Sequence, residues 1–198
     1  MIKTAKVVES IQDNGGFIRT DEVAGRAEYE HIRKAIEDGS LVRVRQGVYA
    51  EQLALANTMI DVEKIVPGGV VCLYSAWSHY QLSTQIPSGH CIAIDAKRKV
   101  TIPEFPPINL YYWKKEYLNI GVTEMEICGY QVKITDVERS VCDAVKYRNK
   151  IGLDVCSEII NEYLKRKNRN ISRLCEYAKQ LRVYNTLSKY LEVVLYHE

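Results

Sequence analysis

The sequence lacks any apolar run long enough to cross a membrane. A membrane-spanning helix needs about 20 consecutive apolar residues, whereas the longest apolar stretches here are as short as residues 70–74, VVCLY. The first residues also lack the apolar core and the small-residue cleavage site of a secretory signal. We therefore expect a cytoplasmic protein without a membrane segment.

Closely spaced metal ligands are also missing. The four histidines are scattered, and no two of the six cysteines stand at C-x-x-C spacing. Structural zinc sites usually have paired ligands at short spacing. The sequence therefore predicts no metal site. Most of the cysteines lie inside apolar runs, which favours reduced, buried thiols.

No constellation of catalytic residues stands out. There is no glycine-rich phosphate loop of either standard type. Asp136, Glu138 and Asp143 are explained by a capping box and by an i,i+4 ion pair between Arg139 and Asp143. Cys142 lies on the inward side of its predicted helix, with no histidine close in sequence. We expect neither catalysis nor a cofactor.

One alternative to this view is a metal-dependent nuclease. Asp95 and Lys97 stand at the end of a predicted strand, as in half of such a site. The site would need a further acid to share the metal. Between Glu51 and Asp95, the acids are Asp61 and Glu63, both on a predicted helix. A solvated strand end is the simpler interpretation.

The composition is that of a soluble globular protein of one or two domains. The chain has 198 residues, of which 46% are hydrophobic and 26% charged, with a net charge of +2. The charges are unevenly spread: residues 146–198 carry +5, residues 97–115 carry +4, residues 116–145 carry −4 and residues 1–50 are neutral. Any binding of phosphates must depend on local patches rather than on global charge.

The first fifty residues predict three short helices. Residues 3–14 follow the helical period and end at Gly15 and Gly16. Thr20 is predicted to cap a short helix that stops at Gly25. A third helix is predicted over residues 28–38, with its apolar side toward a core.

A β-hairpin is predicted to follow these helices. Residues 41–45 and 48–50 read as strands around a tight turn at Gln46 and Gly47. Helices followed by a hairpin are typical of a winged helix-turn-helix, in which the third helix enters the major groove and the hairpin contacts phosphates. Arg43 and Arg45 are two residues apart and would share a face. The predicted DNA-binding residues are His31, Arg33, Lys34, Arg43, Arg45 and Gln46.

Acidic residues on the third helix leave a second interpretation open. Glu28, Glu30 and Glu37 stand beside its basic residues, and carboxylates are unfavourable near phosphates unless one accepts from a cytosine amino group. Small helical units with a hairpin also serve in protein interaction. A protein-interaction module is therefore an alternative to DNA binding.

The rest of the chain predicts a mixed α/β domain. A helix over residues 53–64 is followed by a strand over 70–74, a helix from Ser75, and strands over 91–94, 108–113, 125–128 and 131–134, the last two joined by a turn at Gly129 and Tyr130. The capping box Thr135–Glu138 opens a helix, and further helices are predicted over 153–164, 171–181 and 186–195. The fold class is α+β. The predicted domains are a winged helix-turn-helix, residues 1–52, and an α/β domain, residues 53–198, that ends in a bundle-like helical segment.

Two basic segments of this second domain are candidates for further phosphate contacts. They contain Lys97, Arg98 and Lys99 in one case, and Lys165, Arg166, Lys167 and Arg169 in the other. Solvated loops would have the same composition.

Residues 41–50, LVRVRQGVYA, resemble the hairpin that closes the winged helix of the AbiEi family. This family comprises antitoxins and transcriptional regulators of AbiE (type IV) toxin–antitoxin systems. Similar motifs follow, in the same order, at residues 71–76, 82–87, 137–143 and 177–181. The resemblance thus extends over almost the whole chain.

The resemblance implies a two-domain regulator. The winged helix would repress its own operon by binding inverted repeats of double-stranded DNA in the promoter. The C-terminal domain would counter a nucleotidyltransferase-like toxin, without a stable complex. The neutral N-terminal module departs from what a strong repressor would lead us to expect.

Overall fold

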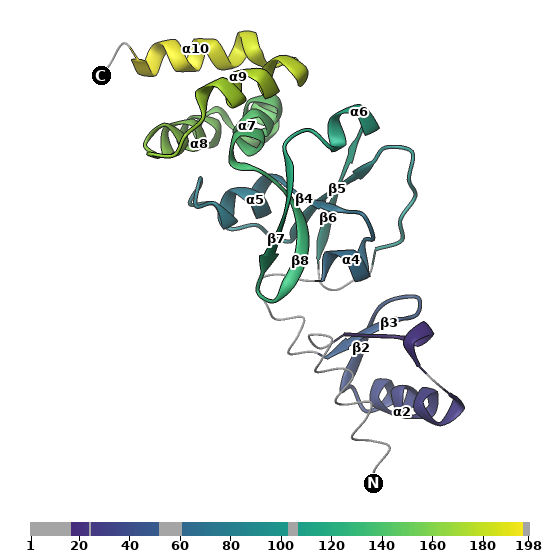
Figure 1. Cartoon of the computed structure of the whole chain (residues 1–198). Helices are drawn as coiled ribbons and strands as arrows, with labels where there is room; N and C mark the ends of the chain where they lie inside the picture. Colours follow the sequence, from purple (N-terminus) through teal and green to yellow (C-terminus); the bar gives the residue numbers. More distant parts are fainter. Residues whose placement is uncertain (1–16, 24, 52–60, 103–106, 196–198) are drawn as a thin grey trace. The chain divides into compact units, whose positions relative to one another are not determined.

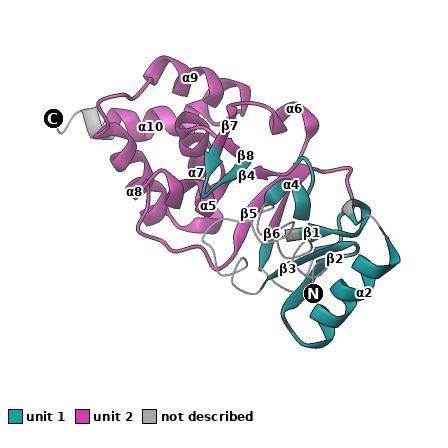
Figure 2. Ribbon diagram, turned by 60° about the horizontal axis from the view of Figure 1, so that its bottom comes forward, with its two compact units in different colours: residues 1–68, 99–108, 126–132 teal, residues 69–98, 109–125, 133–198 magenta. Residues whose placement is uncertain are grey.

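The computed structural model describes residues 17–23, 25–51, 61–102 and 107–195. The chain divides into two compact units, shown in Figure 2. One contains residues 1–68, 99–108 and 126–132, and the other contains residues 69–98, 109–125 and 133–198.

The predicted α+β class is confirmed, since helices accompany two separate sheets. The domain boundary expected after residue 52 falls among residues 52–60, outside the described residues, and stays a prediction. No helix among the described residues is long and apolar enough to span a membrane.

The first sheet joins three antiparallel strands in the order β1-β3-β2. These are β1 (Phe17–Arg19), β2 (Leu41–Arg45) and β3 (Val48–Glu51), and Figure 1 shows α2 (Arg26–Glu37) beside them. Ile18, Ile32 and Leu41 form its small core. The predicted hairpin and third helix are therefore confirmed, with α2 beginning two residues earlier than expected.

The two helices predicted before α2 are not confirmed. The helix expected over residues 3–14 lies outside the described residues. The prediction of Thr20 as a helix cap is wrong: it is the first residue of a single 3-10 turn, η1 (Thr20–Glu22), which has no side-chain cap. The backbone N–H of Thr20 instead donates to the carbonyl of Gly47 at 2.8 Å. A partner distant in sequence has replaced the local one.

The second sheet has the order β6-β5-β4-β8-β7. Its strands are β4 (Val70–Val71), β5 (His90–Asp95), β6 (Ile108–Trp113), β7 (Val122–Ile127) and β8 (Tyr130–Thr135). The central strand β4 runs antiparallel to β5 and parallel to β8. The expected strands over 91–94, 108–113, 125–128 and 131–134 are thus present, and three of them begin within one residue of the predicted start, while β7 begins three residues earlier.

Two boundaries differ from those predicted. The strand expected over 70–74 ends at Val71, because α5 (Leu73–His79) begins with Leu73 at a positive φ of 46°. The turn between β7 and β8 is formed by Cys128 and Gly129, both at positive φ, one residue earlier than predicted. Apolar composition alone does not separate the end of a buried strand from the start of a buried helix.

Short helices lie between the strands. α4 (Val62–Ile65) begins only at Val62, so the prediction of one continuous helix over 53–64 is wrong at its end, and residues 53–60 lie outside the described residues. Asp61 caps it by accepting from the backbone N–H of Lys64 at 3.1 Å. α6 (Lys115–Leu118) follows β6 and has no counterpart among the predicted helices, because four residues are too few to show a helical period.

Four helices complete the chain: α7 (Val137–Ile151), α8 (Leu153–Leu164), α9 (Ile171–Gln180) and α10 (Tyr184–Leu195). In Figure 1 these four helices lie near the C-terminus of the chain. All four contribute to one hydrophobic core together with Trp77 of α5. The three predictions for residues 153–164, 171–181 and 186–195 are confirmed within two residues. Residues 138–145 of α7 are all buried, so the first half of this helix is enclosed rather than one-sided, while residues 146–151 are at least partly exposed.

The cap of α7 is not the predicted box. Asp136 is the capping residue, and its carboxylate accepts from the backbone N–H of Arg139 at 2.8 Å. Thr135 instead pairs its hydroxyl with that of Ser140 at 2.9 Å. Glu138 accepts from the Tyr163 hydroxyl and from the backbone N–H of Asn170, both at 3.2 Å. Packing of α8 and α9 on this turn has drawn Glu138 away from the local cap.

The predicted Arg139–Asp143 pair is present, but it lies in the interior. Both side chains are 0% exposed, with Arg139 Nε 3.0 Å from Asp143 Oδ1. Arg139 Nη1 also donates to the carbonyls of Tyr117 and Ile120, each at 2.7 Å, and the guanidinium lies 4.5 Å from the ring centroid of Trp113. One side chain thus links α7, the end of β6 and the segment after α6.

Burial governs the electrostatics of this pair. Desolvation raises the pKa of Asp143, and the Arg139 guanidinium opposes that rise. Among the described residues, Arg139 Nη2 and Asp143 Oδ2 find no hydrogen-bond partner. The pair therefore meets with one nitrogen and one oxygen rather than with the two parallel bonds of a bidentate contact.

We expect Asp143→Ala to be strongly destabilising, because it leaves a buried guanidinium without its counter-charge. The free energy of unfolding should fall by about 3–5 kcal/mol, as for other buried pairs that lose one partner. Urea denaturation followed by circular dichroism measures the change. The matched control is Glu37→Ala, which removes an i,i+4 pair with Arg33 on the surface of α2 and should cost under about 0.5 kcal/mol. Equal losses would contradict this role for burial.

Candidate nucleic-acid interface

The helix α2 carries charged side chains on the side opposite its core contact. Ile32 is buried in the core of the first sheet, so residues about half a turn away from it face outward. Lys34 and Arg33 are both exposed there, and His31 is half-buried. The three side chains predicted on this helix therefore lie on α2, with the two longest reaching solvent.

Arg33 is bound by two glutamates of its own helix. Its Nη2 lies 3.5 Å from Glu30 Oε2, and its Nε lies 3.5 Å from Glu37 Oε1. All three side chains are open to solvent, with exposed fractions of 59% for Arg33, 47% for Glu30 and 63% for Glu37. The sequence places these acids near the basic residues but does not predict their convergence on one guanidinium.

The end of α2 is fixed by a local hydrogen-bond network. Asp38 accepts from the backbone N–H of Ser40 at 2.9 Å and from its hydroxyl at 2.5 Å. These bonds lower the pKa of Asp38, with the side-chain bond having the larger effect. Gly39 follows the helix at a φ of 79°. The chain is therefore turned sharply from α2 into the strand β2.

The hairpin presents Arg43 and Gln46 to solvent, with Val44 fully buried beneath. The pairing of β2 with β3 is irregular: Arg43 lies opposite Tyr49, while Arg45 lies opposite Val48. This shift interrupts the strict alternation on which the shared face of Arg43 and Arg45 is predicted. The side chain of Arg45 is outside the described residues, so that shared face stays a prediction.

The tip of the hairpin is tethered to η1. Besides the backbone bond already given, the Thr20 hydroxyl donates to the Gly47 carbonyl at 3.4 Å. Gly47 has a φ of 76°, and a Cβ at this position would lie 2.9 Å from Thr20 Oγ1. Only glycine allows this close approach. The tether links a segment before α2 to the strands after it.

Two features of this module are not evident from the sequence. The strand β1 is three residues long, too short for a periodic pattern to reveal. Arg19, at its end, forms a two-bond pair with Asp21 at 3.0 and 3.1 Å. The i,i+2 spacing of opposite charges is the one local signal of that pair. Arg19 is thus a further basic residue of the module, already paired with an acid.

The first predicted phosphate segment is exposed in part. Lys97 and Lys99 reach solvent, and Arg98 is half-buried. The carboxylate of Asp95 accepts from the backbone N–H of Lys97 at 2.9 Å. Asp95 therefore stabilises a turn at the end of β5. Among the described residues, no group of three histidine, cysteine or acidic side chains is placed to hold a metal ion.

The second predicted segment, between α8 and α9, uses its cations for internal contacts. Arg166 donates to the carbonyl of Tyr80 at 2.8 Å, and Arg169 donates to the carbonyl of Leu164 at 2.7 Å. Lys165 pairs with Glu162 at 2.5 Å. Lys167 is exposed. These contacts hold the connection between two helices, which gives most of the basic side chains a structural role.

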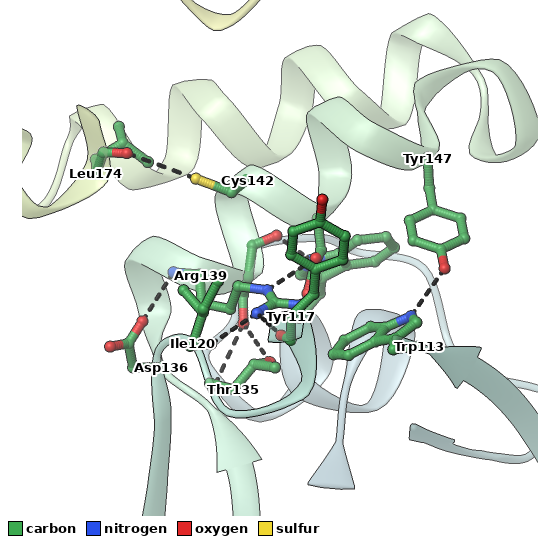
Figure 3. Close-up of polar contacts among 12 residues, drawn as sticks. Trp113, Tyr117, Ile120, Thr135, Asp136, Arg139, Cys142, Tyr147 and Leu174 are labelled. Atoms are coloured by element: carbon green, nitrogen blue, oxygen red, sulfur yellow. Dashed lines mark hydrogen bonds and ion pairs between the residues drawn. The ribbon is translucent and has the colours of Figure 1, made fainter. Parts of the chain in front are cut away.

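The carboxylate of Asp136 and the thiol of Cys142 likewise contact neighbouring groups of the protein. Asp136 accepts from the Tyr177 hydroxyl at 3.1 Å, and burial raises its pKa. The Cys142 thiol is buried and lies 3.6 Å from the carbonyl of Leu174 (Figure 3), and desolvation raises its pKa far above the ordinary value. A protonated thiol in an apolar interior is a poor nucleophile. These groups bind α9 to α7.

Comparison with protein families identifies the N-terminal segment. Residues 6–52 match the family model described as the AbiEi antitoxin transcriptional regulator. The AbiEi resemblance is confirmed over this segment. It contains α2, the three-stranded sheet and the tether at Gly47, which together we call the AbiEi module.

Two further comparisons concern the whole chain. No curated protein matches the sequence. Among solved structures, the RV2827C protein from Mycobacterium tuberculosis is similar, with a TM-score of 0.50 and 12% identity. The alignment covers 97% of this chain and 81% of that one. At this identity the likeness concerns the fold alone.

We expect Gly47→Ala to destabilise the AbiEi module, because the new Cβ would press on Thr20 Oγ1 at an unfavourable φ. A loss of about 2 kcal/mol is expected, made of backbone strain and the disturbed contact. The control Gly39→Ala has a similar φ of 79° but no atom within 4 Å of the added Cβ. It should lose about 1 kcal/mol from strain alone. Thermal denaturation compares the two, and identical losses would argue against the tether.

Proposed function

We propose that this protein is a DNA-binding transcriptional regulator and antitoxin whose residues 1–52 form a winged helix-turn-helix. The observation that carries the proposal is the AbiEi match over residues 6–52, which coincides with a helix followed by a hairpin. Residues 53–198 are then the α/β antitoxin domain. On this proposal the protein is not an enzyme, and it acts in the cytoplasm.

The proposed mode of binding follows from the dimensions of DNA. The major groove of B-DNA accommodates one α-helix, while the flanking phosphates are within reach of a hairpin. We assign α2 to the groove, because its outward side bears long polar side chains that can reach base edges. The hairpin β2–β3 then lies along the backbone, where its turn is held in place by Thr20.

The proposed contact residues fall into two classes. On α2, His31, Arg33 and Lys34 would approach base edges. On the hairpin, Arg43, Arg45 and Gln46 would approach phosphates, which position the protein without reading sequence. Exposed lysines of the second domain, Lys97, Lys99 and Lys167, would add phosphate contacts. Arg166 and Arg169 bind backbone carbonyls and Lys165 pairs with Glu162, so these three would contribute less.

In this proposal the regulator represses its own operon through inverted repeats in the promoter. Inverted repeats place two copies of the protein on neighbouring half-sites, because the symmetry of the DNA is matched by the symmetry of the bound pair. The functional partner is a nucleotidyltransferase-like toxin, countered without a stable complex. A winged helix needs no metal or cofactor for this role.

Removal of both hairpin arginines tests the DNA-binding assignment. Arg43→Ala with Arg45→Ala should weaken binding to the protein's own promoter and flatten its dependence on salt, by about one unit of logarithmic slope for each phosphate that is no longer neutralised. Fluorescence anisotropy at several salt concentrations gives the slope. Lys115→Ala with Lys189→Ala, an exposed pair outside the proposed interface, is the charge-matched control. An unchanged slope in the hairpin variant would overturn the assignment.

The same variant tests whether the two roles are separate. Co-expressed with the toxin encoded beside its gene, the full-length chain should restore growth. The hairpin double variant should lose repression of a promoter reporter yet still restore growth, because neutralisation is assigned to residues 53–198. Simultaneous loss of both activities in a folded, normally abundant variant would contradict this division of labour.

A further inference from the structure

The outward side of α2 carries charges of alternating sign along its length. At 100° per residue, Arg26, Glu30, Arg33 and Glu37 fall within one stripe about 60° wide, which lies to one side of the point opposite Ile32. Lys34 lies on the other side of that point. A helix that only had to be attracted to phosphates would carry cations here. The two acids in the centre and at the end of the stripe therefore need an explanation.

These acids act on one particular cation. Both carboxylates lie 3.5 Å from the Arg33 guanidinium, one from each adjacent turn of the helix. Because all three side chains are exposed to solvent, each ion pair is weak and easily exchanged for another partner. In the free protein the arrangement masks the charge of Arg33 without locking the side chain in place.

The consequence for DNA depends on what the groove offers. To bind a phosphate, Arg33 would have to exchange its two carboxylate partners for that phosphate, while the carboxylates themselves are repelled by the DNA. Binding to a G·C pair is more favourable for both kinds of side chain. Guanine O6 and N7 accept two bonds from a guanidinium, and the cytosine N4 amino group donates to a carboxylate. Arg33 then binds the guanine, and one of its glutamate partners binds the cytosine.

We propose that Glu30 and Glu37 are specificity determinants of the recognition helix. Their negative charges oppose the approach of non-specific phosphates to Arg33, and this opposition is relieved at half-sites that present G·C pairs beneath α2. This inference rests on the proposed function, because it requires α2 to lie in the major groove. It assigns to Glu30 and Glu37 together a role in discrimination that acts through Arg33.

The experiment removes the two negative charges with little change in shape. Glu30→Gln with Glu37→Gln is compared with the wild type on two DNA fragments of equal length and composition, the protein's own promoter and a scrambled version. Affinity for the scrambled fragment should rise at least about tenfold, given that like-charge juxtaposition strongly opposes binding. The ratio of promoter to scrambled affinity should fall by about tenfold, the worth of one base contact.

Two controls separate this mechanism from a general gain of positive charge. Glu116→Gln with Glu126→Gln makes the same charge change at exposed positions of α6 and β7, and should leave the ratio unchanged. Adding Glu30→Gln and Glu37→Gln to an Arg33→Gln background should raise the affinity for both fragments alike and leave their ratio nearly unchanged, since Arg33 is the group whose base contact the two glutamates control. Circular dichroism verifies that each variant keeps its helix content.

The outcomes distinguish this inference from the function on which it rests. If the wild type shows no salt-dependent binding to its promoter, the proposed function itself fails. If the wild type binds and the glutamine variant leaves the affinity ratio unchanged, only the inference fails. A fall in affinity for both fragments would also overturn it. A loss of discrimination that depends on Arg33 supports it.

Discussion

The packing of the C-terminal half of the chain depends on the contacts of one buried group, the guanidinium of Arg139. It neutralises Asp143 one turn along α7, is closed to solvent, and satisfies the carbonyls of Tyr117 and Ile120. Burying a charged group costs free energy unless the group is paired and hydrogen-bonded. The segment after α6 must therefore lie where Arg139 can reach it. Gly121 shows how closely it does, because a Cβ added there would lie only 2.6 Å from the Cβ of Arg139.

The same spacing of charges has opposite consequences on α2 and α7. Arg33 and Glu37, like Arg139 and Asp143, stand four residues apart, with the basic residue first. Solvent screens the pair on α2, so its partners can be exchanged for those of a ligand. In the interior no such exchange is possible, and the pair is structural. The proposed function therefore depends on the exposed pair, and the fold on the buried one.

Sequence reasoning succeeded where the structure is stabilised locally. The helix over residues 153–164 and the hairpin around Gln46 and Gly47 have patterns that periodicity and turn chemistry reveal directly. It failed where a distant segment supplied the partner. Thr20, expected to cap a helix, instead bonds Gly47, and Glu138, expected in a capping box, instead receives Tyr163 and Asn170. The polar groups were correctly identified, but their partners came from other elements.

For the candidate interface, residue type and spacing were enough to establish that α2 is followed by the hairpin β2–β3. They also place Arg33, Lys34, Arg43 and Gln46 on a helix and a hairpin, because these are local properties of the chain. The packed structure was needed to show that the third strand β1 completes the sheet, that the hairpin tip is tethered to η1, and that Arg33 is exposed while Arg139 is enclosed. Burial arises only when distant segments pack together, and it is burial that separates an ion pair available to DNA from one that holds the fold together.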